Sequence, residues 1–180
     1  MRKIAAMRLL LALLLAIAPA GGFDLPSSSK QVVVGIAPDW NASHVTVFLY
    51  ERSGRNWKQA GGPWKGRLGK KGLAWGRGLH PVPAGSTTKR EGDWRAPAGV
   101  FRIGGVWSYH PPAQVRRHPK TFYRQVTPRD LWYEDPASPY YNQHRVLDHN
   151  PHTAAEKKAQ MKQDDYPHSL KLFIAHNAPP

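Results

Sequence analysis

The 180-residue sequence contains no cysteine, which excludes disulfide bridges as a source of stability. Packing and hydrogen bonds must therefore hold the fold together. Acidic residues are also scarce, because 12 Asp and Glu stand against 26 Lys and Arg and give a formal net charge of +14. A chain with this excess of positive charge is expected to bind polyanions.

Long apolar runs are missing except near the N-terminus, where three basic residues precede an apolar run over residues 9–18. Small residues follow up to Ala20, and this is the layout of a secretory signal peptide. Residues 1–20 are therefore interpreted as a leader that is cleaved near Ala20, with export to the periplasm or cell envelope. The run is shorter than the roughly 20 apolar residues that span a bilayer, so no stable membrane anchor is expected after cleavage.

Basic residues and tryptophans are interleaved in one part of the mature chain. Such a mixture can bind nucleic acid through phosphates and base stacking. The export signal argues against that function, so no nucleic acid partner is expected. Anionic envelope polymers are the alternative partners, and a solvated basic face with half-buried tryptophans is the structural alternative. Residues 52–95 hold eleven Lys or Arg against Glu91 and Asp93, together with Trp57, Trp64, Trp75 and Trp94.

The apolar pattern predicts a mainly β fold with one short helix and long loops. The helix begins at a capping box, in which Thr153 accepts from a backbone amide and Glu156 reaches back, and it is expected to continue to Gln163. Glycines and proline at 61–63, and the glycines that follow, predict loops. The expected strands are residues 31–36 and 44–51, both largely buried, a segment near Trp57, and residues 100–103 and 170–176.

A charged segment at residues 89–95 contains both kinds of partner for an internal ion pair. The glycine at its centre, Gly92, allows a tight turn between two carboxylates, and basic residues flank both sides. These charges either hold the loop against neighbouring strands or contact a substrate directly. The candidate substrate-binding residues are Lys89, Arg90, Glu91, Asp93 and Arg95.

Pro97 and Gly99 extend this segment into a Lys-x-Glu-Gly-Asp-x-x-x-Pro-x-Gly pattern. In this it resembles the YkuD-type L,D-transpeptidase domain, and residues 72–80, 135–142 and 174–177 are similar to the same family in order and spacing. The resemblance implies an incomplete YkuD-like mixed β-sheet or sandwich, as one L,D-transpeptidase-like domain over residues 21–180.

The resemblance also implies a peptidoglycan enzyme. In that family a cysteine thiolate attacks a peptide stem, expels a terminal D-alanine, and passes the acyl group from a thioester to an amine of another stem. The implied partners are peptidoglycan peptide stems, and the resemblance implies neither a metal nor a cofactor.

The chain departs from that family at its C-terminal end. In the family, a strand like that at 170–176 is followed by a strand with a histidine and then by a Thr- or Ser-x-Gly-Cys element. We expect a domain truncated before these residues, inactive as written, with no catalytic residue to assign and with Phe173 and Ile174 facing the gap. The alternative is a non-catalytic basic module that binds peptidoglycan or anionic envelope polymers.

Histidines are frequent in the second half of the chain. His144, His149 and His152 surround Asp148 in sequence, and His168 and His176 follow. Their spacing fits no familiar zinc motif, so they are interpreted as surface histidines of a proline-rich loop, and no metal is expected.

Overall fold

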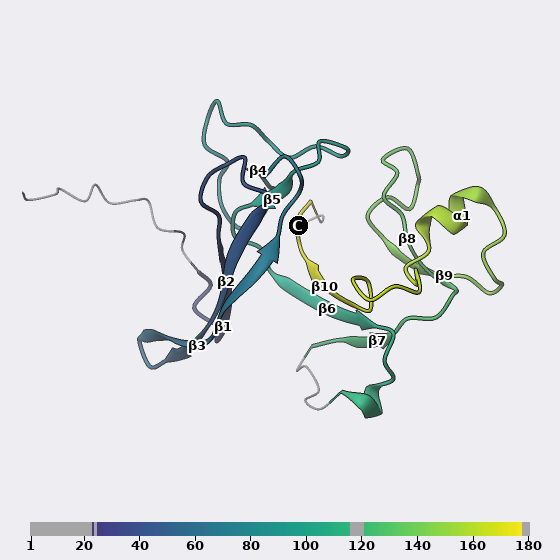
Figure 1. Cartoon of the computed structure of the whole chain (residues 1–180), viewed down its shortest axis with the longest axis horizontal. Coiled ribbons are helices and arrows are strands. Elements are labelled where there is room, and N and C mark those ends of the chain that lie inside the picture. The colour runs from purple at the N-terminus through teal and green to yellow at the C-terminus, as the bar shows by residue number, and fades with distance from the viewer. Residues whose placement is uncertain (1–22, 24, 116–120, 178–180) are drawn as a thin grey trace, which may run out of the picture.

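The computed structural model describes Phe23 and residues 25–115 and 121–177. The expected signal peptide at residues 1–20 lies outside the described residues. The described part is mainly β with one short α-helix, and its strands form four small sheets (Figure 1). Across the described ranges, none of the helices has the length and apolar character needed to cross a membrane.

The first sheet is an antiparallel meander of β1 (Gln31–Ile36), β2 (His44–Ser53) and β3 (Asn56–Arg67). The β-branched residues of β1 and β2 favour extended backbone, as the sequence pattern predicted. The expectation that both strands are largely buried is wrong, because neither strand contains a buried residue and β1 leaves Val33 47% and Ile36 57% exposed, one on each of its faces.

The glycines at 61, 62 and 66 lie inside β3 rather than in loops, which corrects the sequence-based prediction. Packing explains their place in a strand. A Cβ on Gly66 would lie 2.9 Å from a methyl group of Val45 on the neighbouring strand. Register shifts near Leu49 let β2 and β3 remain paired around these positions.

The second sheet contains the main apolar cluster. It has the order β10 (Leu170–Ile174), β6 (Ile103–Ser108), β7 (Tyr123–Gln125), with β10 antiparallel and β7 parallel to β6. The buried side chains of Trp107, Val126 and Met161 pack together, and Phe173 of β10 joins them. Phe173 therefore faces this cluster, whereas Ile174 is exposed. Both residues were expected to face an open gap, and of the two only Ile174 lies on an open face.

Two smaller sheets complete the described part. β4 (Leu73–Trp75) pairs in parallel with β5 (Ala96–Ala98), and β8 (Asp130–Trp132) pairs antiparallel with β9 (His144–Val146). The expected strand at 100–103 is displaced, because β5 ends before it and β6 begins at its last residue. A short 3-10 turn covers Pro112–Gln114.

The helix α1 covers Ala154–Ala159, and its predicted capping box at Thr153 and Glu156 is confirmed. It ends earlier than expected, since Gln160 has extended backbone. In Figure 1, β1 to β5 gather on one side, β8, β9 and α1 lie on the other, and β6 and β10 run between them. The chain thus returns through β10 to a position beside the β4 and β5 region.

Candidate functional site

The charged turn at residues 89–95 is closed around Asp93. One carboxylate oxygen lies 2.8 Å from Lys89 Nζ and accepts from the Arg95 backbone N–H at 2.9 Å, while the other accepts from Arg90 N–H at 2.8 Å. Burial raises the pKa of Asp93, but these donors outweigh it and lower the pKa to about 2. Gly92 has φ of 74° at the tip, as the predicted turn requires.

Arg95 fixes this turn to the rest of the fold. Its guanidinium donates to the carbonyl oxygens of Trp40 at 3.2 Å and Leu73 at 2.8 Å, and to Asn41 Oδ1 at 3.3 Å. Lys89, Asp93 and Arg95 are therefore engaged in holding the loop. Arg90 and Glu91 are exposed at the tip, where their side chains are accessible.

Glu91 connects the turn to a second predicted segment. Its Oε2 lies 3.4 Å from the hydroxyl of Tyr141, which belongs to residues 135–142. The amide of Asn177 donates to the same hydroxyl at 3.4 Å. The charged turn and the end of the C-terminal strand therefore meet at one tyrosine.

Asn177 is the centre of this meeting point. Its Oδ1 accepts from Arg77 Nη1 at 3.0 Å, and its carbonyl oxygen accepts from Asn142 Nδ2 at 3.1 Å. The two asparagines adopt positive φ values of 58° and 57°, which Asn tolerates better than most residues. We call this cluster the four-segment junction, and its members are Arg77, Glu91, Tyr141, Asn142, His176 and Asn177.

His176 is half-buried within the junction. Its Nδ1 accepts from the Arg77 backbone N–H at 3.1 Å, so the neutral ring carries its proton on Nε2. Desolvation lowers the pKa of His176, and the positive charge of Lys89 lowers it further. A neutral imidazole that offers an N–H donor is the form expected near neutral pH.

A groove of about 420 Å³ borders the junction along β10. Trp132 and Phe173 supply apolar surface, while Glu134, Lys171 and His176 supply a carboxylate, an ammonium and an imidazole. Lys171 Nζ donates to the carbonyl oxygens of Met161 at 2.8 Å and His168 at 2.6 Å, which fixes its position. The groove thus offers both signs of charge beside aromatic rings, which suits a short zwitterionic peptide.

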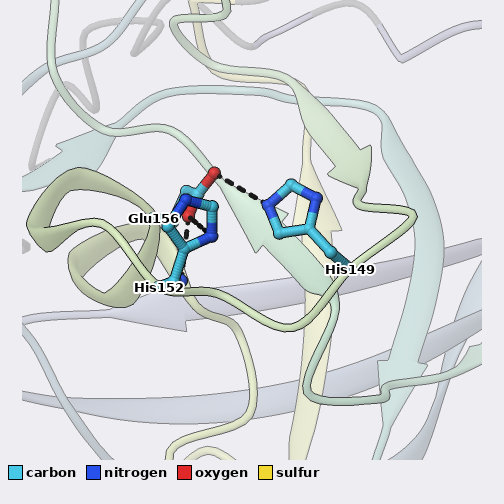
Figure 2. A group of neighbouring side chains, drawn as sticks. All are labelled: His149, His152 and Glu156. Atoms are coloured by element: carbon cyan, nitrogen blue, oxygen red, sulfur yellow. Dashed lines mark hydrogen bonds and ion pairs between the residues drawn. The ribbon is translucent and has the colours of Figure 1, made fainter.

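The histidines of the second half separate into different environments. His144 contacts the fully buried carboxylate of Asp130 at 2.8 Å and packs against Trp107. His149 and His152 instead lie beside Glu156, and the side chains of all three converge (Figure 2). Sequence reasoning grouped the histidines with Asp148 and assigned Glu156 to the helix cap alone. Glu156 was missed as a possible ligand because its capping role already explained it.

Asp130 is a structural carboxylate rather than part of the junction. Arg124, Thr127 and His144 all donate to or pair with it, with Arg124 Nε at 2.5 Å and Thr127 Oγ1 at 2.6 Å. Burial raises the pKa of Asp130, but these partners outweigh burial and lower the pKa to about 2. The charge joins β7, β8 and β9.

Comparison with known proteins gives no relative to place beside this site. No family model, no curated protein and no solved structure matches the chain.

Proposed function

We propose that the chain is an exported protein of the YkuD-type L,D-transpeptidase kind that recognises peptidoglycan peptide stems in the groove beside the four-segment junction. The observation that supports this proposal is that the four segments similar to the YkuD-type family converge at the junction. Residues 72–80, 89–99, 135–142 and 174–177 are far apart in sequence, yet each contributes a side chain to one hydrogen-bonded cluster.

The chemistry of the groove suits that ligand. A peptide stem carries free carboxylates and a free amine on its diamino acid. Lys171 and the Nε2 proton of His176 can face carboxylates, while Glu134 can face the amine. Trp132 and Phe173 cover the apolar parts of the stem. The groove therefore supports recognition of the stem through a small number of polar contacts.

Acyl transfer needs more than recognition. In the resembled family the transfer passes through a cysteine thioester, and these 180 residues contain no cysteine. His176 has its Nδ1 occupied by the Arg77 N–H, so it is not placed to accept a proton from a nucleophile through that atom. The activity proposed for the described residues is therefore binding of stems.

The test is calorimetric titration of the purified chain with a synthetic tetrapeptide stem that ends in a diamino acid and D-alanine. Glu134→Gln removes the groove carboxylate, and we expect it to weaken binding about tenfold, as for one lost charge-assisted hydrogen bond. Glu51→Gln, an equal charge change on β2, is the matched control and should leave the affinity unchanged. Equal affinities for both variants, or no heat of binding at all, would refute the proposal.

A second function, a basic module for anionic envelope polymers, is favoured by one observation. The β2–β3 hairpin exposes five basic side chains, at Arg52, Arg55, Lys58, Lys65 and Arg67. Retention on insoluble peptidoglycan at rising salt separates the two functions, because contacts with a polyanion weaken steeply with ionic strength. Retention that Glu134→Gln leaves intact and that salt abolishes would favour the basic module.

A further inference from the structure

We infer that His149, His152 and Glu156 form a binding site for a divalent first-row transition metal of the zinc class, with Asp148 as an outer carboxylate. This site lies at the start of α1, away from the four-segment junction, and it is independent of the proposed function. Figure 2 shows both imidazole rings turned toward the Glu156 carboxylate.

The distances suit tetrahedral coordination. His149 Nε2 lies 3.2 Å from Glu156 Oε1, the oxygen assigned as the ligand, and His152 Nδ1 lies 3.4 Å from the other oxygen of the same carboxylate, Oε2. Metal–ligand bonds of about 2.1 Å at tetrahedral angles separate neighbouring ligand atoms by roughly 3.4 Å. One ligand atom from each residue lies within 4.8 Å of the others. Both histidines are exposed, so small rotations of their rings would close the widest of these separations.

The helix cap orients the carboxylate. Glu156 Oε2 accepts from the backbone N–H groups of His152 and Thr153, each at 3.0 Å. That leaves Oε1 directed at His149 as the ligand atom. A carboxylate already held by two backbone donors needs little further ordering to bind a cation, which lowers the entropy lost on binding.

Asp148 supplies the outer contact that metal-binding histidines usually have. Its Oδ1 lies 2.6 Å from His149 Nδ1, so the Nδ1 proton is directed to Asp148 and the Nε2 lone pair is available on the side facing Glu156. The two nitrogens of His149 therefore lie between two carboxylates, in a place that favours a positive charge. The cluster provides two nitrogens and one oxygen, which suits Zn²⁺, and leaves a fourth position for water or for an anionic group.

The experiment is titration of the full chain with Zn²⁺ by calorimetry, with Co²⁺ absorption as the readout of coordination geometry. We expect one ion per chain and a tetrahedral Co²⁺ spectrum. His149→Ala and His152→Ala should each weaken binding at least about tenfold. Asp148→Asn should weaken it by about 10-fold to 100-fold, which is the usual effect of removing an outer partner.

Two variants separate ligation from folding of the helix. Glu156→Gln keeps a capping-box residue but removes the anionic ligand, so it should weaken binding while the helix signal is preserved. Thr153→Ala weakens the cap and leaves all three ligands, so it should retain most of the affinity. His44→Ala removes an exposed histidine on β2 and should change nothing. Unchanged affinity in His149→Ala and His152→Ala, or the absence of saturable binding by the unmodified chain, would overturn the inference.

Discussion

The backbone N–H of Arg77 donates a hydrogen bond of 3.1 Å to Nδ1 of His176, although 99 positions separate the two residues. This contact fixes the ring and its tautomer. The junction around it is the place where the C-terminal strand returns to the β4 and β5 region (Figure 1). The protonation state of His176 is therefore part of how the two halves of the described chain are joined.

The first prediction concerns the pH response of His176. Desolvation and the nearby Lys89 charge lower its pKa in the folded chain below the ordinary value of about 6.5. As pH falls through 6.5, the unfolded chain takes up a proton before the folded chain does, so the free energy of unfolding decreases. Above pH 6.5 this effect is absent.

Nuclear magnetic resonance titration of the ring protons measures the pKa directly, and urea unfolding between pH 5 and pH 7 measures the stability. His176→Gln should flatten the stability curve in that window, because the titrating group is gone. A His176 pKa at or above the ordinary value would contradict the prediction.

The second prediction concerns the buried carboxylate of Asp130, which is fully inaccessible and has partners on Arg124, Thr127 and His144. Removing one member of a buried charge network leaves the others without a partner and costs about 3 to 5 kcal/mol. Asp130→Ala should lower the free energy of unfolding by that amount in urea melts. Glu134→Gln, an exposed carboxylate, should stay within about 0.5 kcal/mol of the unmodified chain.

The same carboxylate produces an acid limit to stability, together with Asp93. Both have a folded pKa of about 2 against an ordinary value of 3.8. Since the folded pKa is depressed, the stabilisation is complete above pH 3.8 and is lost as pH falls toward 2. Thermal melts across that range should show a steeper fall for the unmodified chain than for Asp130→Asn, and parallel curves would contradict the assignment.

The sequence predicted those elements of the fold that are determined by residues close together in the chain. The capping box at Thr153 and Glu156 and the β-branched strand β1 are of this kind. The extension of β3 through Gly66 was not predictable in this way, because it depends on pairing with Val45 of another strand. Propensity favours a loop there, and the packing of a neighbouring strand overrides it.

The candidate site shows the same division. The motif residues of the charged turn were identified, and the turn at Gly92 is as expected. The hydrogen-bond partners within the junction were not predicted, because Arg77, Tyr141 and Asn177 meet only once the chain is folded. Sequence order placed the segments but contained no information on which side chains would touch.

The third prediction explains why glycine occupies position 99. Gly99 has φ of 136°, and a Cβ there would lie 1.9 Å from Cε1 of the His80 ring. His80 is buried and its Nδ1 accepts from the Val100 N–H at 3.1 Å, so the ring cannot move without losing that bond. Gly99→Ala should destabilise the chain by about 3 kcal/mol or more, since backbone strain and overpacking act together.

Gly85→Ala is the matched control for Gly99→Ala. Gly85 also has positive φ, at 75°, but nothing lies within 4 Å of a Cβ built there. Gly85→Ala should lower the free energy of unfolding by only about 1 to 2 kcal/mol, which is the cost of placing a residue with a Cβ in the left-handed backbone conformation. Chemical denaturation of both variants gives the difference, and equal losses would show that the His80 contact is unimportant.

The fourth prediction separates the two roles within the charged turn. Arg95→Lys should cost about 1 to 2 kcal/mol of stability, because one ammonium cannot replace a guanidinium that donates to Trp40, Asn41 and Leu73. Arg90→Ala should leave stability within about 0.5 kcal/mol, because Arg90 is exposed. Arg90 lies outside the groove lining, so a contact with the stem would have to come from the exposed tip of the turn. With such a contact, the order reverses in the stem-binding titration, and Arg90→Ala reduces affinity more than Arg95→Lys.

The fifth prediction concerns the outward face of β10, where Leu170, Leu172 and Ile174 are 63%, 48% and 42% exposed. Alternation along the strand places Phe173 in the core and these three side chains at the surface, where Ile103 of β6 adjoins Ile174. β10 also lies at the edge of its sheet. An apolar face on an edge strand promotes self-association. We therefore expect the apparent mass in light scattering to rise with protein concentration.

Leu172→Lys should suppress that rise, because a charge on an edge strand opposes pairing with another copy. The free energy of unfolding should change by less than about 0.5 kcal/mol, since the side chain is exposed. Tyr166→Lys introduces the same charge at a 90% exposed position outside any strand and should leave association as it is. If Tyr166→Lys suppresses association as strongly as Leu172→Lys, net charge rather than the face of β10 governs it, because the effect would then not depend on position.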